Sequence, residues 1–232
     1  MHKVLFISIL LLTSFCLSAQ DVVFENEVKD YSQLDENGPN LKKFSHTYVT
    51  YGLNLGENIA GAKIHYGSSG FYEFGFRHKR KFSKVFSGGY GVSGRFSSFK
   101  LVQEAGKILP DASINKKETL NFYSIGGELY FRINFSKKRG NLIGLYMDLG
   151  GRADYNYHML LQRKNKVGSV TFKSNSYGYD FDIPYNFGPL FRFGYNQFAL
   201  TANYRYSDFF KSSANLPELP RLMLGIEIST FD

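Results

Sequence analysis

The amino-acid sequence predicts an all-β protein, folded as an eight-stranded antiparallel up-and-down transmembrane β-barrel. Three observations lead to this prediction. Apolar and polar residues alternate with a period of two in eight segments after residue 45. The chain holds 23 Phe and 17 Tyr, yet its mean hydropathy is slightly negative. Long and short connections take turns between the eight segments, which is typical of barrels that cross an outer membrane.

Composition excludes several other classes of protein. The 232 residues are 43% hydrophobic and 21% charged, with only 6 Pro, so a disordered or collagen-like chain is excluded. The longest apolar run, residues 4–12, is too short for a membrane-spanning helix. We therefore exclude a helical membrane protein as well.

The chain divides into three parts. Residues 1–20 have the order of a secretory signal peptide, because Lys3 precedes the apolar run and small residues follow it. Cleavage there would remove Cys16, the single cysteine, so we expect an exported protein without disulfides. Residues 21–44 hold six acidic residues against three lysines and are expected to form an acidic periplasmic leader. Residues 45–232 are the predicted outer-membrane β-barrel.

Each of the eight alternating segments predicts one strand of about ten residues. In chain order the segments are 46–55, 72–77, 89–96, 123–135, 143–155, 185–195, 198–207 and 221–229. The first four carry these apolar residues on one face: Val49, Tyr51 and Leu53; Tyr72, Phe74 and Phe76; Tyr90, Val92 and Phe96; Ile125, Leu129, Phe131 and Ile133. The last four carry these: Leu145, Met147 and Leu149; Phe187, Phe191 and Phe193; Phe198, Leu200 and Tyr204; Leu222, Leu224, Ile226 and Ile228. Pro189 cannot donate to a strand ladder, so we expect a bulge or a local break in the sixth strand.

The connections distinguish the two ends of the predicted barrel. The long ones are residues 57–69, 100–119, 158–178 and 208–220, and the short ones are 80–85, 136–141 and 196–197. In outer-membrane barrels the short turns face the periplasm and the long loops face outward. Because the number of strands is even, we expect both termini on the periplasmic side of the outer membrane of a Gram-negative bacterium.

The alternation by itself leaves two orientations open, since a soluble ligand-binding barrel would have its apolar face inside. Eight strands enclose only enough space for a filling of side chains or for one small ligand. Several bulky apolar side chains from each strand would overfill that space, whereas the other face is rich in Gly, Ser, Thr and Asn. We therefore expect the polar face inside and the aromatic face in lipid.

Arginine and lysine are distributed differently along the chain. Seven of the ten arginines lie on the polar face of predicted strands, and all eighteen lysines lie in the signal, the leader, the turns and the loops. Arginine is preferred where buried charges must be paired, because its planar fork can bind a carboxylate through two hydrogen bonds. We expect a filled interior crossed by a charge network that consists of Glu73, Arg77, Arg95, Glu128, Arg132, Asp148, Arg152, Asp154, Arg192, Arg205, Arg221 and Glu227.

Three features carry a resemblance to a known group of proteins. They are the signal ending Ser18-Ala19-Gln20, the aromatic and glycine-rich strands, and the apolar closing strand from Leu222 to Phe231. Together they resemble the outer-membrane β-barrel families of Bacteroidota, loosely the PorT-like group, and the eight-stranded architecture is similar to that of OmpA and OmpX barrels. The resemblance covers roughly residues 45–231. It implies location and fold, and it suggests an accessory subunit of a secretion, gliding or assembly complex.

The sequence offers little for catalysis. It has no cluster of His and Cys with metal-ligand spacing, no phosphate-binding loop and no nucleophile elbow, so we expect no metal, no cofactor and no catalytic residue. One alternative is open: His158 follows Asp154 by four residues, and an acid and histidine pair could activate water in an outer-membrane lipid-modifying hydrolase. The plainer interpretation is that Asp154 pairs with an interior arginine and that His158 is a loop residue.

Basic residues gather in three connections. Two clusters fall in predicted periplasmic turns: Lys79, Arg80, Lys81 and Lys84; and Lys137, Lys138 and Arg139. They either lie solvated near anionic lipid head groups or dock an acidic partner such as the leader. In a long outer loop, Arg163, Lys164 and Lys166 are candidates for contact with lipopolysaccharide phosphates or with a surface ligand.

These observations predict a monomeric outer-membrane protein that serves as a structural or interaction subunit, with a filled interior that prevents porin-like flux. Its expected partners are outer-membrane lipid, lipopolysaccharide and a protein of an outer-membrane or periplasmic complex, and no nucleic acid is expected. The second hypothesis is a narrow channel or small-ligand carrier, and the third is a lipid-modifying enzyme.

Overall fold

A computed structural model of the chain describes residues 37–57, 59–135, 142–167, 169–177 and 181–230. The predicted signal peptide and most of the predicted leader lie outside the described residues, as do Lys137, Lys138 and Arg139. Within the described part, no helix is long and apolar enough to cross a membrane.

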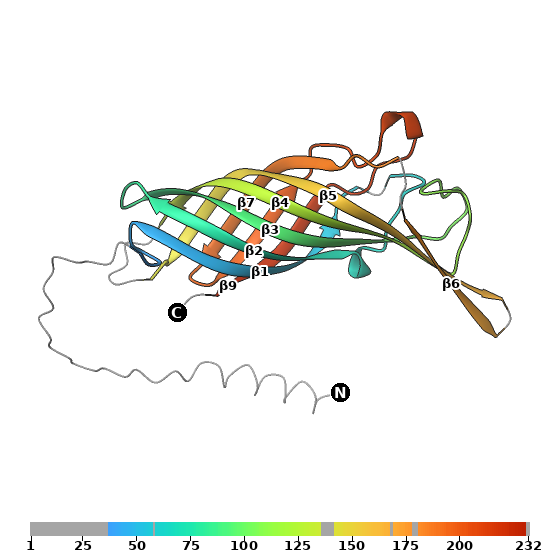
Figure 1. Ribbon diagram of the computed structural model, residues 1–232, viewed down its shortest axis with the longest axis horizontal. Helices are drawn as coiled ribbons and strands as arrows, with labels where there is room; N and C mark the ends of the chain where they lie inside the picture. Colours follow the sequence, from blue (N-terminus) through green and yellow to red (C-terminus); the bar gives the residue numbers. More distant parts are fainter. Residues whose placement is uncertain (1–36, 58, 136–141, 168, 178–180, 231–232) are drawn as a thin grey trace, which may run out of the picture. The chain divides into compact units, whose positions relative to one another are not determined.

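The described chain is all-β, with nine strands and two single-turn 3-10 helices (Figure 1). The strands are β1 (Lys43–Leu55), β2 (Gly70–Lys81), β3 (Phe86–Leu101), β4 (Lys117–Asn134), β5 (Leu145–Val167), β6 (Val170–Tyr177), β7 (Tyr185–Tyr195), β8 (Phe198–Tyr204) and β9 (Leu222–Thr230). The 3-10 helices are η3 (Tyr66–Ser68) and η4 (Ser212–Ala214). Each of the eight predicted segments falls on one of these strands, and β6 is the additional one.

Eight of the strands close into a ring in which every neighbouring pair is antiparallel. The pairing runs β4-β3-β2-β1-β9-β8-β7-β5, and a further pairing of β4 with β5 closes it. The predicted all-β architecture with eight antiparallel strands is thereby confirmed, although β6 intervenes between β5 and β7 in the chain. The leader's predicted boundary differs slightly, because β1 begins at Lys43 rather than after residue 44.

The register of the ring determines how far its strands tilt. From Val49, the residues directly opposite on successive strands lead through β2, β3, β4 and β5 to Tyr185 of β7. In the other direction, through β9 and β8, they lead from Val49 to Tyr195 of the same strand. The two routes end ten residues apart (195 − 185). With a rise of about 3.3 Å per residue and strands about 4.8 Å apart, this offset corresponds to a tilt of about 40° in a closed sheet of eight strands.

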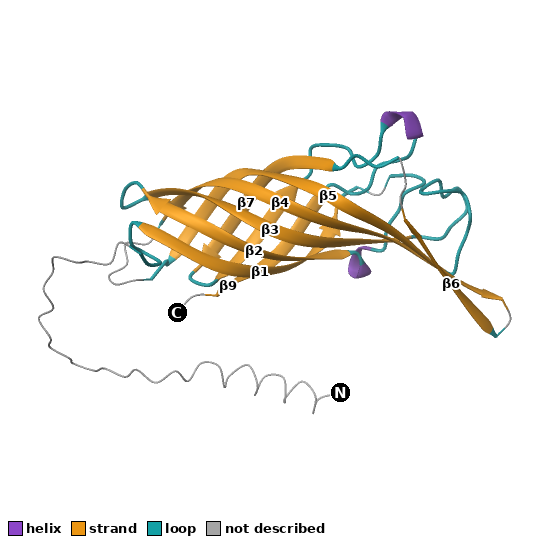
Figure 2. Cartoon of the chain, viewed as in Figure 1, coloured by secondary structure: helices purple, strands orange, loops and turns teal. Residues whose placement is uncertain are grey.

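Short and long connections lie at opposite ends of the ring (Figure 2). One end, the turn end, holds the β2–β3 turn, the end of β4, the start of β5 and the two-residue β7–β8 turn, together with the start of β1 and the end of β9. Asn196 adopts a left-handed conformation, with φ of 52°, as tight hairpin turns require. The other end, the loop end, holds the long connections.

One predicted loop is a β-hairpin instead. The sequence indicates a loop over residues 158–178, but β5 continues to Val167 and β6 pairs back along it. This β5–β6 hairpin extends from the loop end of the ring (Figure 1). The alternation of apolar and polar residues fails here because the hairpin is largely exposed on both faces, so neither face needs to be apolar.

The predicted irregularity at Pro189 is present. The β7–β8 ladder extends from the turn end only as far as the pair of Leu190 and Asn203, so Pro189, the next residue toward the loop end, is not paired with β8. Contact between the two segments resumes beyond it, where the Tyr206 N–H donates to the Phe187 carbonyl at 2.8 Å. The gap follows from the missing N–H of proline.

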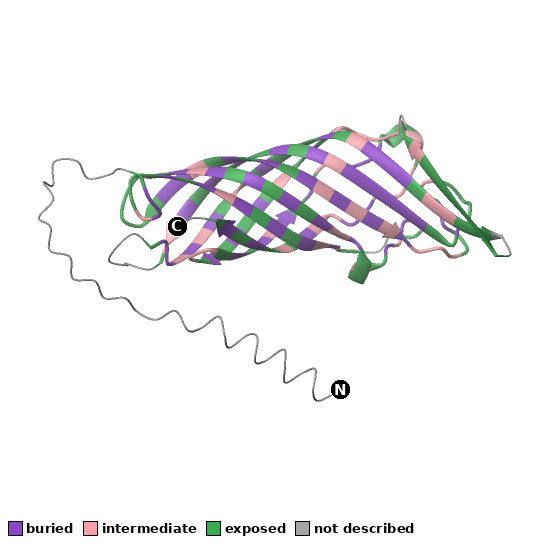
Figure 3. Cartoon of the chain, turned by 60° about the horizontal axis from the view of Figure 1, so that its bottom comes forward, coloured by how far each residue is buried: buried purple, intermediate pink, exposed green. Residues whose placement is uncertain are grey.

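Buried and exposed residues alternate along the ring strands (Figure 3). Outward side chains are apolar and exposed, as for Phe74 (63%) and Leu129 (71%), whereas inward Arg77 and Asp148 are fully buried. The predicted orientation of the two faces therefore holds through the middle of the ring.

Near the loop end, however, the interior is apolar. A cluster of buried side chains fills it: Ala62, Ile64, Phe99, Leu101, Leu109, Leu120, Phe122, Met159, Leu161, Phe209, Phe210 and Leu219. This corrects the expectation of a polar interior throughout. The strands project past the charged section at this end, and the apolar side chains of the long loops fold back between them.

Candidate functional site

Ten charged side chains fill the middle of the ring. Five are arginines and five are carboxylates: Arg77, Arg95, Arg132, Arg152 and Arg192, with Glu73, Glu128, Asp148, Asp154 and Glu227. All belong to the network predicted from the sequence. Their formal charges balance, which is the arrangement that keeps buried ions tolerable in a low-dielectric interior.

Arg192 lies at the centre of this network. Its guanidinium contacts Asp148 at 2.7 Å, Glu128 at 3.0 Å and Glu227 at 3.2 Å, so one side chain of β7 joins carboxylates from three other strands. Arg77 contacts Glu128 and Glu227, each at 2.7 Å. The five donors of a planar guanidinium suit such shared pairing better than the three donors of an ammonium group.

The remaining arginines extend the network in two directions. Arg132 binds Asp148 through two hydrogen bonds of 2.6 and 2.9 Å. Nearer the loop end, Arg95 and Arg152 share Glu73, each at 2.7 Å. Asp154, on the same strand as Arg152, accepts from it at 2.7 Å.

Inward tyrosines stack on two of these arginines, and glycines make room for them. The Tyr48 ring lies 3.9 Å from the Arg77 guanidinium, and the Tyr146 ring lies 3.7 Å from that of Arg132. Directly opposite these tyrosines are Gly75 and Gly194. A Cβ atom on either glycine would meet the ring at 2.5 or 2.3 Å, so only glycine fits.

The turn end is closed by the chain that precedes β1. Gly38 and Pro39 are buried, and the Pro39 carbonyl accepts a hydrogen bond from the Lys79 ammonium. Lys81 donates to the Asn40 carbonyl at 2.8 Å. The last residues before β1 therefore lie against β2.

This geometry changes the interpretation of one predicted basic cluster. Lys79, Arg80 and Lys81 belong to β2 rather than to the turn, and Lys79 is buried because it faces inward. Lys84 lies in the turn and is exposed. The Pro39 carbonyl accepts from this buried lysine, and no carboxylate among the described residues pairs with it.

The loop end carries a second group of ion pairs around Glu118. Its buried carboxylate accepts from Arg163 at 2.8 Å and from Lys107. Arg163 also pairs with Asp111. Partial burial opposes the shift, but hydrogen bonds from Ser113 and the nearby Arg163 charge hold the pKa of Asp111 below its usual value.

Two predicted network members lie at the loop end instead of in the network. Arg205 is buried, pairs with Glu218 at 2.9 Å and lies 3.8 Å from the Phe209 ring. Arg221 is partly exposed and pairs with Asp208. Arg205 follows the end of β8 and Arg221 precedes the start of β9, so neither lies on a strand whose register would place its side chain at the centre of the ring.

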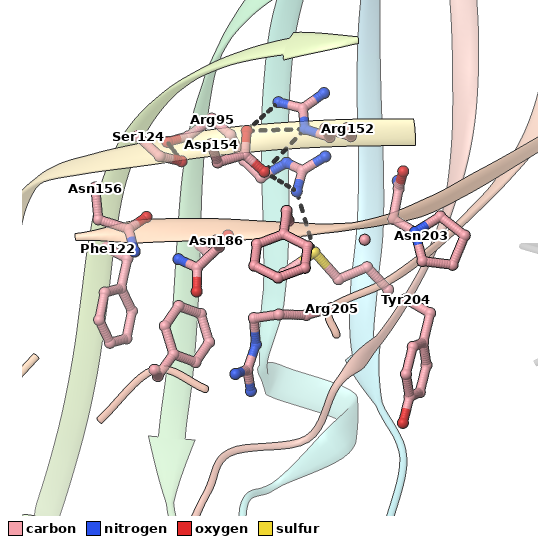
Figure 4. A pocket seen from close by; sticks show the side chains of 16 residues that line it. Arg95, Phe122, Ser124, Arg152, Asp154, Asn156, Asn186, Asn203, Tyr204 and Arg205 are labelled. Carbon is pink, nitrogen blue, oxygen red and sulfur yellow. Dashed lines mark hydrogen bonds and ion pairs between the residues drawn. The ribbon is translucent and has the colours of Figure 1, made fainter. Parts of the chain in front are cut away.

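A small chamber, lined by both polar and apolar side chains, lies between the charge network and the apolar cluster (Figure 4). Its volume is about 30 Å³, enough for no more than a few water-sized groups. Figure 4 shows Arg95, Arg152 and Asp154 along one side of it. Within the described residues, Asn156 Nδ2 and Asn203 Oδ1, both at this chamber, have no hydrogen-bond partner.

The predicted acid and histidine pair is not formed. The β4–β5 register shifts between Tyr123 and Ser124, and Tyr157 is the extra residue on β5. Asp154 therefore faces the interior, whereas His158 faces outward and stacks on Tyr177 at 5.4 Å. Spacing of four residues places side chains on one strand face only where no bulge intervenes.

Several contributors were not identified from the sequence. The interior tyrosines and the Glu118 group are examples. A glycine directly opposite a tyrosine, as Gly75 is opposite Tyr48, would indicate an inward tyrosine, but this pairing is known only once the strand register is known. In the ranges that the structure describes, no group of His, Cys, Asp and Glu has the geometry of a metal site.

Comparison with other proteins identifies no family. No protein-family model matches this chain, and no curated protein matches it.

Proposed function

We propose that this chain is an outer-membrane β-barrel with a sealed interior, which acts as a structural and interaction platform through its two ends. The outward face of β7 is the observation that carries the proposal. Its successive outward residues are Tyr185, Phe187, Pro189, Phe191, Phe193 and Tyr195, all exposed. A face so apolar is unfavourable in water and favourable in lipid.

The height of this face supports the proposal. Ten residues at about 3.3 Å each, tilted by about 40°, span about 25 Å along the ring axis. Apolar bands of outer-membrane barrels are about 25 Å tall and are bounded by aromatic girdles. Tyr185 and Tyr195 stand at the two boundaries, where a ring with a polar hydroxyl group is favoured.

The filled interior argues against a porin-like activity. Ions would have to cross the apolar cluster and the charge network, which are buried, and pass Gly38 and Pro39, which are buried before β1. The surfaces left for interaction are the loop end and the turn end. An accessory role in a secretion, gliding or assembly complex, suggested by the resemblance, stays a prediction.

The absence of Trp from the chain provides a clean test of membrane insertion. We expect Phe191→Trp, in vesicles whose lipids carry bromine in the middle of the acyl chains, to lose most of its fluorescence, because position 191 lies in the middle of the β7 face. Leu200→Trp, on the neighbouring strand, should behave alike.

The matched control is Phe82→Trp, which replaces an exposed ring in the β2–β3 turn. Its fluorescence should be little affected by bromine at the same depth. Equal and weak quenching at all three positions would show that the ring does not lie in the membrane.

A further inference from the structure

Three lysines form a row across three neighbouring strands at the loop end. Lys117 of β4 lies directly opposite Lys164 of β5, which lies directly opposite Lys173 of β6. All three side chains therefore share one face of the sheet, about 5 Å apart from strand to strand. Like charges directly opposite one another destabilise a sheet.

No acidic residue of the described ranges pairs with this row. Among the described residues, none of the three lysines forms an ion pair. The nearest acidic group on these strands, Glu118, faces the other side and is taken up by Arg163 and Lys107. The positive charge of this face is therefore available to an anion from outside the chain.

A second row, one step nearer the ring, adds uncharged hydrogen-bonding groups. Thr119, Gln162 and Asn175 are paired directly across the same strands. Together with the lysines they line a groove of about 320 Å³. Asn121 donates to the Gln162 carbonyl oxygen at 3.2 Å, which leaves the Gln162 amide free to donate. Hydroxyl and amide groups in this arrangement suit the hydroxyls of a sugar.

Aromatic rings lie between this groove and the apolar outside of the ring. The Tyr123 ring lies 5.6 Å from the His158 ring, which stacks on Tyr177 at 5.4 Å. On this one face, apolar side chains are followed by the rings of Tyr123 and His158, then by the row of Asn121, Leu160 and Tyr177, then by hydroxyl and amide groups, then by lysines. The same succession of chemistry is found from the acyl chains of a lipid to an anionic head group.

The distance between the rows selects the kind of lipid. Lys117 is six residues from Tyr123, which is about 20 Å along the strand and about 15 Å along the ring axis at a tilt of about 40°. The head-group region of a simple phospholipid extends only about 5–8 Å beyond the hydrocarbon. A ligand that reaches both rows must carry its anionic groups on a saccharide several units long.

We propose that this face binds the phosphorylated or carboxylated saccharide of an outer-leaflet glycolipid. The lysines pair with its anionic groups, Thr119, Gln162 and Asn175 bind its hydroxyls, and the aromatic row contacts its lipid end. This inference rests on the proposed membrane location. Arg163 also lines the groove, but it pairs with Glu118 and Asp111, so the inference rests on the three lysines.

The test uses the full chain in detergent micelles and, as probe, the phosphorylated core oligosaccharide released from rough lipopolysaccharide. The variant Lys164→Gln with Lys173→Gln should weaken binding on the order of twentyfold, because each lost lysine contributes to attraction of the anion. Arg80→Gln with Lys84→Gln, an equal loss of charge at the turn end, should change binding less than twofold. Dephosphorylated oligosaccharide should bind the unchanged chain more weakly than the phosphorylated form, because part of its anionic charge is removed.

Each alternative outcome contradicts a distinct part of the proposal. Equal binding by the two double variants would overturn the lysine site, while the bromine quenching of Phe191→Trp would still report on membrane location. Binding of phosphatidylglycerol vesicles with the same dependence on Lys164 and Lys173 would overturn the saccharide requirement. Binding of the free oligosaccharide as tightly as intact lipopolysaccharide, in a chain that shows no bromine quenching, would overturn the lipid source.

Discussion

At the scale of single residues, the interior depends on arginines whose charge is shared among several carboxylates. Arg192 contacts three carboxylates and is itself fully buried. The net contribution of such a group to stability is modest, since desolvation offsets the attraction. Removal of one member is different, because it leaves opposite charges buried without compensation.

We therefore expect Arg192→Met to lower the free energy of unfolding by about 3–5 kcal/mol, since Asp148, Glu128 and Glu227 would each lose a partner. Urea titration of the folded chain in lipid vesicles measures this change.

Arg221→Met is the matched control, because Arg221 pairs with Asp208 at the partly exposed loop end. Its effect should be about 0–1 kcal/mol, as for surface ion pairs. Similar losses for the two variants would show that the interior network carries no special energetic weight.

At the scale of strands, glycines allow the inward tyrosines to lie flat against the ring wall. Gly194 is opposite Tyr146, whose ring is held between that strand and Arg132. Because Tyr146 is almost fully buried, it cannot move aside to admit a larger neighbour. This explains why glycine is frequent on the inward face although it is unfavourable in strands.

Gly194→Ala should therefore destabilise the protein by about 1–3 kcal/mol, through overpacking against the Tyr146 ring. Gly94→Ala, on an outward position of β3 with open space around it, should leave stability unchanged or slightly raised. The midpoints of thermal unfolding of the two variants provide the comparison. An equally stable Gly194→Ala variant would mean that the ring has room to shift.

At the scale of the whole ring, three layers close the interior. The segment before β1 lies at the turn end, the charge network fills the middle, and the apolar cluster fills the loop end. The chamber between the charge network and the apolar cluster has a volume of only about 30 Å³. A continuous aqueous path along the axis is therefore absent from the described residues.

Accordingly, the purified chain should produce no stable conductance steps in planar bilayers, because ions cannot replace their hydration within the packed layers. An open porin, added to the same bilayers, is the positive control. Sustained, reproducible openings would support the channel hypothesis over the sealed platform.

The parts of the fold that could be predicted share one physical cause. Where a strand separates an apolar from a polar environment, as in the segments around Phe74 and Phe191, every second residue must change character, so the sequence displays the strand. The β5–β6 hairpin is exposed on both faces, so Lys164 and Lys173 follow no such rule. The arginines of the network were predictable by type, because a buried charge restricts the choice of residue.

By itself, the sequence predicted the eight ring strands, the orientation of their two faces and twelve interior charges, of which ten form the network, because burial imposes a period of two. Only the tertiary structure decided which charges meet, since register pairs Arg192 with acids from three other strands. It also decided the separation of Asp154 from His158, because one extra residue at Tyr157 reverses the face of every residue after it. The lysine row has the same origin: Lys117, Lys164 and Lys173 are far apart in sequence, and strand pairing alone brings them together.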